Sequence, residues 1–174
     1  MAAFTDFMEN KLVDFLLRGQ ALGITGASAG AGSGPTNLYI GLLTATPTDS
    51  TAGTEVSGGS YARVTVASTL ANWAGTQSAG STVASSGTGG TTSNNGTITF
   101  PAPTANWGTI TGMGIYDASS GGNLLIYAAL TTSKTVNNGD AAPSHIAGTQ
   151  NFYVVTRYNW SSYYAMAVID LGSA

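Results

Sequence analysis

From residue 36 onward, the sequence breaks into short runs rich in Val, Ile, Thr, Tyr and Phe, each bounded by Gly, Asn, Asp, Ser or Pro. Such runs favour strands, and the residues that bound them favour turns. Strands are predicted at residues 38–45, 61–68, 97–100, 109–116, 124–130, 134–136, 152–157 and 163–171. Because no second helical period interrupts these runs, they predict an all-β fold, an antiparallel β-sandwich of jelly-roll or immunoglobulin-like form.

One amphipathic helix is predicted before the strands. Its large apolar residues recur at the i, i+3, i+4 spacing of one helical face. These residues are Phe4, Phe7, Met8, Leu12, Phe15 and Leu16. Thr5 or Asp6 can cap the start, and Gly19 fits a left-handed C-cap, so the helix should run from residue 4 or 5 to about 18. Asp14 and Arg18 have the spacing of an i, i+4 ion pair.

The apolar stripe of this helix needs a partner, because a helix of this length is marginal alone in water. Two partners stay open: the protein's own sheet, or a neighbouring subunit. We take the six apolar residues as candidate assembly contacts. Residues 19–35 contain six glycines, a closing Pro and no charge, which is typical of a flexible connector. The chain is therefore expected to divide into a helix with a Gly-rich arm, residues 1–35, and a β-sandwich domain, residues 36–174.

Charged residues make up 7% of the chain, where about 25% is typical of soluble domains. The run from residue 64 to residue 116 has none at all. Within it, residues 75–97 contain a single large apolar residue, Val83, so their own composition cannot repay the entropy of ordering them. Alone, this segment is expected to be mobile, and a surrounding assembly would be needed to hold it.

The residues present argue against most catalytic chemistry. The chain has no Cys and one His, His145, which excludes thiolate nucleophiles and the common Cys- or His-rich metal sites. Residues 26–30 match G-x-S-x-G but lack the strand, the helix and the partners of a nucleophile elbow. Residues 117–123 imitate the start of a calcium loop, yet position twelve is Ala128, so a hairpin turn is favoured. Residues 137–140 predict a tight turn.

Other partner classes are also argued against. The five basic residues are scattered, which speaks against nucleic acid, and the longest apolar run is too short to cross a membrane. No cofactor is indicated. A glycan-active enzyme would need two carboxyl groups within about 10 Å in a cleft, and the acidic residues are single in sequence, so they do not predict such a pair. We therefore expect no enzyme. An aromatic-rich C-terminal hairpin could stack on sugars or pack at an interface, the second being favoured. Its residues are Tyr158, Trp160, Tyr163 and Tyr164.

Four motifs in this order resemble small virion proteins of tailed bacteriophages. They are residues 38–49 (LYIGLLTATPTD), 55–64 (EVSGGSYARV), 107–109 (WGT) and 114–117 (GIYD). The likeness covers most of residues 4–140 and ends after Asp140. The resemblance implies a capsid decoration or cement protein that stabilises the shell at capsomer junctions. Its partners would be the major capsid protein and copies of itself, as a homo-oligomer on the capsid exterior.

A tail role is the alternative that the resemblance allows. The chain would then be a minor tail or tail-fibre component, and its aromatic C-terminal residues would bind a host surface glycan. A cement protein buries its arm in the shell, whereas an adhesin leaves its aromatic loop exposed.

Overall fold

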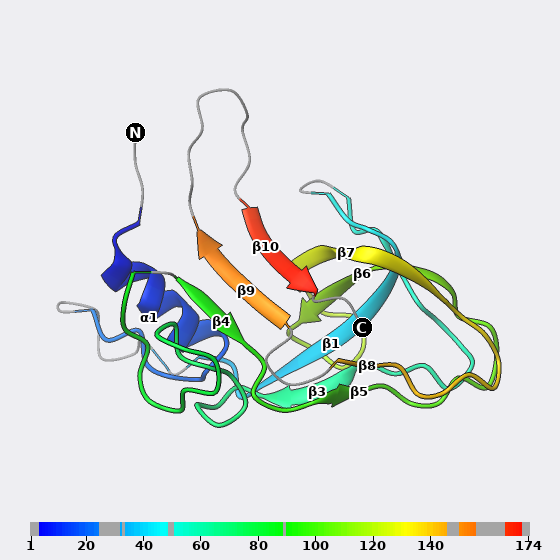
Figure 1. Ribbon diagram of the computed structural model, residues 1–174, viewed down its shortest axis with the longest axis horizontal. Helices are drawn as coiled ribbons and strands as arrows, with labels where there is room; N and C mark the ends of the chain where they lie inside the picture. Colours follow the sequence, from blue (N-terminus) through cyan, green and yellow to red (C-terminus); the bar gives the residue numbers. More distant parts are fainter. Residues whose placement is uncertain are drawn as a thin grey trace.

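The computed structural model describes residues 4–24, 32, 34–48, 51–88, 90–145, 150–155 and 166–171, the last two ranges by their backbone. In this part of the chain one helix precedes ten strands (Figure 1). The elements are α1 (Asp6–Leu16), β1 (Asn37–Ala45), β2 (Thr54–Glu55), β3 (Val64–Ala67), β4 (Thr91–Ser93), β5 (Ile98–Thr99), β6 (Gly108–Tyr116), β7 (Leu124–Val136), β8 (Ser144–His145), β9 (Gln150–Val155) and β10 (Met166–Leu171).

The strands form three antiparallel sheets. The largest has the order β2-β1-β6-β7, with β3 pairing the other end of the β1 edge that β2 occupies. A second sheet has the order β10-β9-β4, and β5 pairs with β8. The mostly β, antiparallel character and the N-terminal helix confirm the prediction at that level, while the sandwich form stays a prediction. Three of the short strands, β2, β4 and β8, were not predicted.

The predicted strands at 124–130 and 134–136 are one strand, β7. Its pairing with β6 shifts register between Ile110 and Gly112, whose partners are Lys134 and Ala129. Residues 130–133 of β7 therefore stand opposite the single residue Thr111 of β6. This is a bulge in β7, and it lies where the sequence predicted a break between two strands. The two predicted turns are confirmed. Residues 117–122 connect β6 to β7 as a hairpin loop, and the 137–140 turn is closed by an Asn137 N–H···Asp140 Oδ2 hydrogen bond of 2.7 Å.

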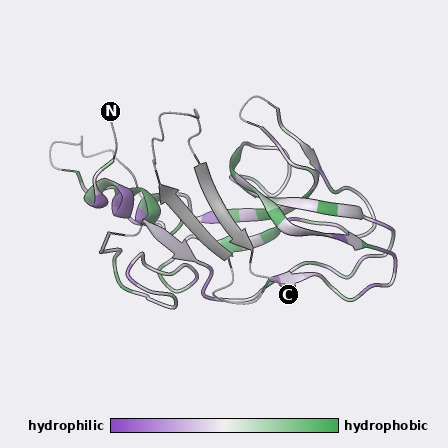
Figure 2. Cartoon of the chain, turned by 45° about the horizontal axis from the view of Figure 1, so that its top comes forward, coloured by the Kyte–Doolittle hydropathy of each residue, from purple (hydrophilic) through white to green (hydrophobic). Residues whose placement is uncertain are grey.

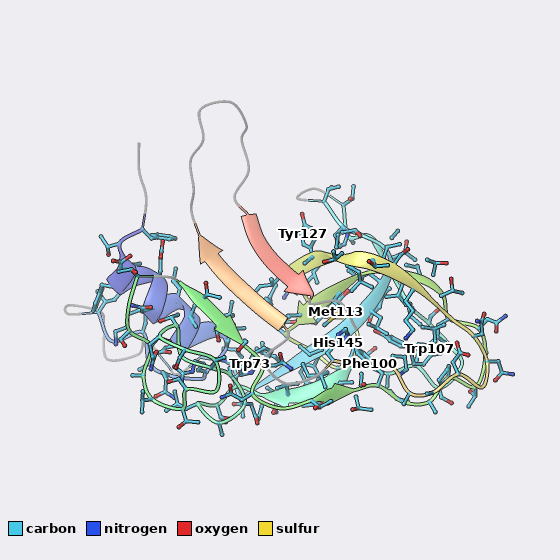
Figure 3. The ribbon with its side chains drawn as sticks, viewed as in Figure 1. Trp73, Phe100, Trp107, Met113, Tyr127 and His145 are labelled. Atoms are coloured by element: carbon cyan, nitrogen blue, oxygen red, sulfur yellow. The ribbon has the colours of Figure 1, made fainter. Side chains whose placement is uncertain are left out.

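The core lies on one face of the large sheet. Side chains alternate along β1, and Ile40 and Leu42 stand opposite Ile115 and Met113 of β6 on that face. All four are 2% exposed or less. Loop aromatics cover them, which explains why a chain with many small residues still closes a core (Figure 3). These aromatics are Trp73, Phe100 and Trp107.

The start of α1 follows the predicted cap, whereas its end lies earlier than predicted, at Leu16 with Leu17 as the C-cap. Thr5 is the N-cap and its hydroxyl accepts a hydrogen bond from the Met8 N–H at 3.4 Å. Gly19 has φ +65° and lies with its Cα against the Ser68 carbonyl, where a Cβ would collide. The chain can therefore leave the helix here only through a glycine.

Candidate functional site

The helix α1 faces the rest of the protein with a mixed polar stripe rather than with its aromatic stripe. Val13 and Leu17 are buried to 0% and 1% exposure, and Leu17 belongs to the core. Between and beside them on the same side lie three buried polar residues, Asn10, Asp14 and Arg18. Both kinds of residue are visible along α1 in Figure 2. This orientation was not predicted, because the apolar stripe is the wider one in sequence.

The aromatic stripe lies mainly on the solvent side. Phe4 is 48% exposed and Phe7 is 57% exposed. Three further candidates are only half-buried, and we call these five residues together the outer face of α1. They are Phe4, Phe7, Met8, Leu12 and Phe15. The sixth candidate, Leu16, is half-buried and packs against the protein's own core, so it belongs to the other side.

The helix α1 also carries charged residues. The ammonium of Lys11 lies 5.8 Å from the Phe7 ring centroid, in the range of a cation–π contact. Two acidic residues of the first turn, Asp6 and Glu9, lie about 100° and 160° around the helix from Phe7. Partial burial and the nearby Asp6 charge raise the pKa of Glu9 above its ordinary value. The outer face is thus apolar, with the Lys11 ammonium against Phe7.

The polar stripe of α1 holds the charge-free segment in place. Arg18, fully buried, donates from Nε to the Trp73 carbonyl at 3.0 Å and from Nη2 to the Val83 carbonyl at 2.7 Å. Its Nη1 donates to Asp14 Oδ1 at 2.6 Å and to Ser85 Oγ at 3.1 Å. The rigid fork of a guanidinium suits this task, because it offers five donors at fixed angles.

Asp14 and Asn10 extend the same network. The second oxygen of Asp14 accepts from the Ser85 N–H at 2.9 Å. Asn10 donates to the Gly87 carbonyl at 3.0 Å and accepts from the Thr76 hydroxyl. Residues 76–87 are therefore held within the chain, where the sequence suggested a surrounding assembly. The stabilisation comes from Asn10 and Asp14 of α1 and from Arg18 just after it, all far away in sequence.

A second network joins the motifs that carried the resemblance. Glu55 accepts from Arg63 in a bidentate pair at 2.8 and 2.7 Å and from the Tyr61 hydroxyl at 2.8 Å. Tyr61 in turn accepts from the Leu42 N–H at 2.8 Å, which fills the gap on the β1 edge between β3 and β2. Burial raises the pKa of Tyr61 well above its usual range, so the phenol stays neutral and can donate.

Arg63 carries this network to the β6–β7 hairpin. Its guanidinium lies 3.4 Å from the centroid of the Tyr116 ring, and Nη1 donates to the carbonyls of Ala118 and Gly121 at 2.6 and 2.8 Å. Hydrogen bonding to Glu55 raises the pKa of Arg63. Both oxygens of Glu55 are thus engaged, which makes this a structural clamp and not an acid–base site. Glu55, Tyr61 and Arg63 belong to a motif that the sequence analysis identified, but nothing in the sequence indicated that their side chains bond to one another.

The near-matches to chemical motifs have structural explanations where they are described. Asp117 accepts at 2.7 Å from both the Asn123 N–H and the Asn123 side-chain amide, which lowers its pKa and uses its carboxylate to close the hairpin. His145 lies on β8 with its ring edge-to-face against Phe100, centroids 6.2 Å apart. Among the described residues no three His, Asp or Glu side chains gather as a metal site would require.

Other predictions fall outside the described residues or concern membranes. The G-x-S-x-G match at 26–30 and the whole aromatic patch lie outside the described residues. The patch comprises Tyr158, Trp160, Tyr163 and Tyr164. Within the described part of the chain, no helix has the length and apolar character needed to cross a bilayer.

The family model described as Podophage GP4 fiber I protein gp80 matches residues 3–150. This range contains α1 and both polar networks, and it ends before the aromatic C-terminal residues. No curated protein matches the sequence.

Proposed function

Because the chain belongs to the gp80 family of podophage fiber proteins, which are non-enzymatic structural components of the virion, we propose that it is joined to a tail fibre through the outer face of α1. The family supports the tail-fibre alternative over the capsid cement role that we predicted first. The family likewise supports a location in a fibre and not on the capsid exterior, which we predicted first. It gives no support to the major capsid protein as the main partner.

The observation that carries the proposal is the orientation of α1. Its inward side combines buried apolar residues with polar residues that bond within the chain, whereas Phe4 and Phe7 remain about half exposed. Exposed aromatic residues clustered on one helical face are a common mark of a protein contact. Covering them would contribute roughly 1.5–3 kcal/mol for each large side chain that becomes fully buried.

The character of the outer face specifies its partner. An amphipathic helix with apolar anchors at i, i+3 and i+4 spacing fits an apolar groove on another protein. The Lys11 ammonium beside Phe7 favours a groove with an acidic side chain at its rim, since complementary charges steer association. We therefore assign the outer face to another polypeptide of the fibre or tail with an apolar groove.

Photo-crosslinking in intact particles tests this assignment. A benzophenone amino acid replaces Phe7, and as a matched control it replaces Leu125, which is 37% exposed on β7 and remote in sequence from α1. The proposal expects the Phe7 probe, but not the Leu125 probe, to form a defined cross-link to a different virion polypeptide, identified by mass spectrometry. Cross-links from Phe7 only within this chain, or equal products from both positions, would contradict it.

Glycan binding by the aromatic C-terminal residues stays a prediction of the sequence. Its test is binding of host surface polysaccharide by the full chain, compared with the Trp160→Ala variant. A loss of binding in that variant would support the prediction, and unchanged binding would contradict it.

A further inference from the structure

Val83 has the largest exposed fraction among the exposed large apolar residues of the described chain, at 63%. It lies in the loop of residues 76–87, which the polar stripe of α1 fixes from the inside. Arg18 donates to the carbonyl of Val83 itself at 2.7 Å, and Asp14 accepts from the Ser85 N–H two residues later at 2.9 Å. The loop backbone is thus held in one place while the Val83 side chain points into solvent. We call this side chain with its loop the Val83 knob.

Burying an arginine and a carboxylate is costly, and the pair stabilises a fold only when its hydrogen bonds are well made. Here those bonds fix a loop that contributes little apolar surface to the core. An apolar side chain in water gains nothing for folding. A rigid loop of small neutral residues around an apolar tip has instead the character of a preorganised binding surface.

A groove of about 180 Å³ lies elsewhere on the same chain, between β3 and β5. Val64, Val66 and Ile98 supply its apolar lining, and the exposed residues Thr65 and Thr97 supply uncharged polar groups. A cavity of roughly 150 Å³ is enough to hold a benzene molecule. The groove therefore has room for the isopropyl group of a valine.

We infer that the Val83 knob of one copy of this chain inserts into the β3–β5 groove of another copy. Both surfaces lie in the run 64–116, which has no charged residue. Neither surface offers a charge to steer a charged partner, and each lacks the charged groups that would be costly to desolvate in an interface core. The room in the groove and the absence of charge from both surfaces support a second copy as the occupant.

The inference accounts for the long charge-free run, which the fold alone does not require. A contact between two different patches of the same chain can repeat from copy to copy, or be exchanged reciprocally between two copies. It uses a surface other than the outer face of α1. Its failure would leave the proposed docking of α1 intact, and the reverse also holds.

Sedimentation velocity of the purified full chain over a range of concentrations tests the inference. The wild type should associate reversibly. Val83→Lys should weaken association about tenfold or more, because a charge enters an apolar groove. Thr65→Glu should weaken it too, whereas a mixture of the Val83→Lys and Thr65→Glu chains should associate again through the new charge pair. Leu125→Lys, at another exposed apolar position, should behave as the wild type.

Each other result counts against the inference. A wild type that stays monomeric at its highest soluble concentration would overturn it, including when the loop then binds a host polysaccharide or another protein. So would association that survives Val83→Lys, or a mixture of the two charged variants that stays dissociated. Circular dichroism of each variant shows whether it is folded, so that a loss of association can be distinguished from unfolding.

Discussion

Arg18 donates a 2.6 Å hydrogen bond to Asp14 one turn earlier on α1, and neither side chain is more than 5% exposed. The pair has the sequence spacing of an ordinary surface ion pair on a helix. Its burial gives it another role, because the remaining donors and acceptors of both residues hold the backbone of residues 73–85. Two of the few charged residues of this chain thus hold an uncharged segment in place.

Arg18→Met should destabilise the protein by about 3–5 kcal/mol, since it leaves the Asp14 carboxylate buried without its cation. Arg18→Lys should recover only part of this, because an ammonium cannot reach the same set of carbonyls. Urea unfolding measures the loss. Lys11→Met, on the exposed side of the same helix, is the control and should stay within about 0.5 kcal/mol of the wild type. Similar losses for Lys11→Met and Arg18→Met would show that the buried network is not what matters.

Tyr61→Phe should cost about 1–3 kcal/mol, because it leaves the Leu42 N–H on the β1 edge without its acceptor. It also removes one hydrogen bond to Glu55. Tyr39→Phe, at a half-buried position on β1, provides the comparison and should change stability by less than about 0.5 kcal/mol. Thermal unfolding of the two variants side by side decides the matter, and equal shifts would refute the role given to the Tyr61 hydroxyl.

Two glycines with similar φ angles allow the effect of backbone strain to be distinguished from that of a steric collision. Gly19 (φ +65°) lies against the Ser68 carbonyl, whereas Gly58 (φ +76°) faces open space. An alanine at either position bears the strain of a positive φ, about 1–2 kcal/mol. Gly19→Ala should cost about 1–3 kcal/mol more than Gly58→Ala, because its Cβ also forces α1 away from residue 68. Chemical denaturation gives both values, and a smaller effect at Gly19 would contradict the close approach.

His145 should make the protein acid-sensitive. Burial lowers its pKa from 6.5 to about 4, so the unfolded chain binds a proton more readily than the folded one. Its contribution is therefore complete above pH 6.5 and is lost as the pH falls toward 4, by up to about 3 kcal/mol. His145→Gln should flatten this part of the stability–pH curve. A curve of unchanged slope in the variant would show that other groups cause the acid sensitivity.

Local signals predicted α1 well, because periodicity and capping residues act within a few positions of each other. Thr5 caps the helix as the sequence indicated, whereas the helix ends at Leu16, two residues before the predicted end, and Gly19 has a positive φ just beyond it. Its orientation could not be predicted, since the partners of Asp14 and Arg18 lie more than 50 residues away. The only signal in the sequence for this orientation was the pair Asp14 and Arg18, which stands just before the charge-free residues 19–35. Most strands were predicted from their composition, whereas β2, β4 and β8 are too short to carry a pattern.

The candidate site was predicted in part. Of the six apolar residues predicted as assembly contacts, five lie on the outer face of α1 and Leu16 packs inward, while their role as contacts stays a prediction. The Glu55–Arg63 clamp was missed because eight positions separate its ends, a spacing that no single strand or helix turn brings together. The loop that contains Val83 was predicted to be mobile alone, because its own composition offers little to stabilise it. Its support depends on tertiary hydrogen bonds, which composition does not reveal.

The central claim is that the outer face of α1 attaches this protein to the phage fibre. Its most direct test counts copies of the protein per purified particle by quantitative mass spectrometry, for the wild type and for the folded variants Phe7→Asp and Leu125→Asp. We predict a low, fibre-like copy number for the wild type, the same number for Leu125→Asp, and strong depletion for Phe7→Asp. Full incorporation of Phe7→Asp, or hundreds of wild-type copies as in a capsid lattice, would contradict the account.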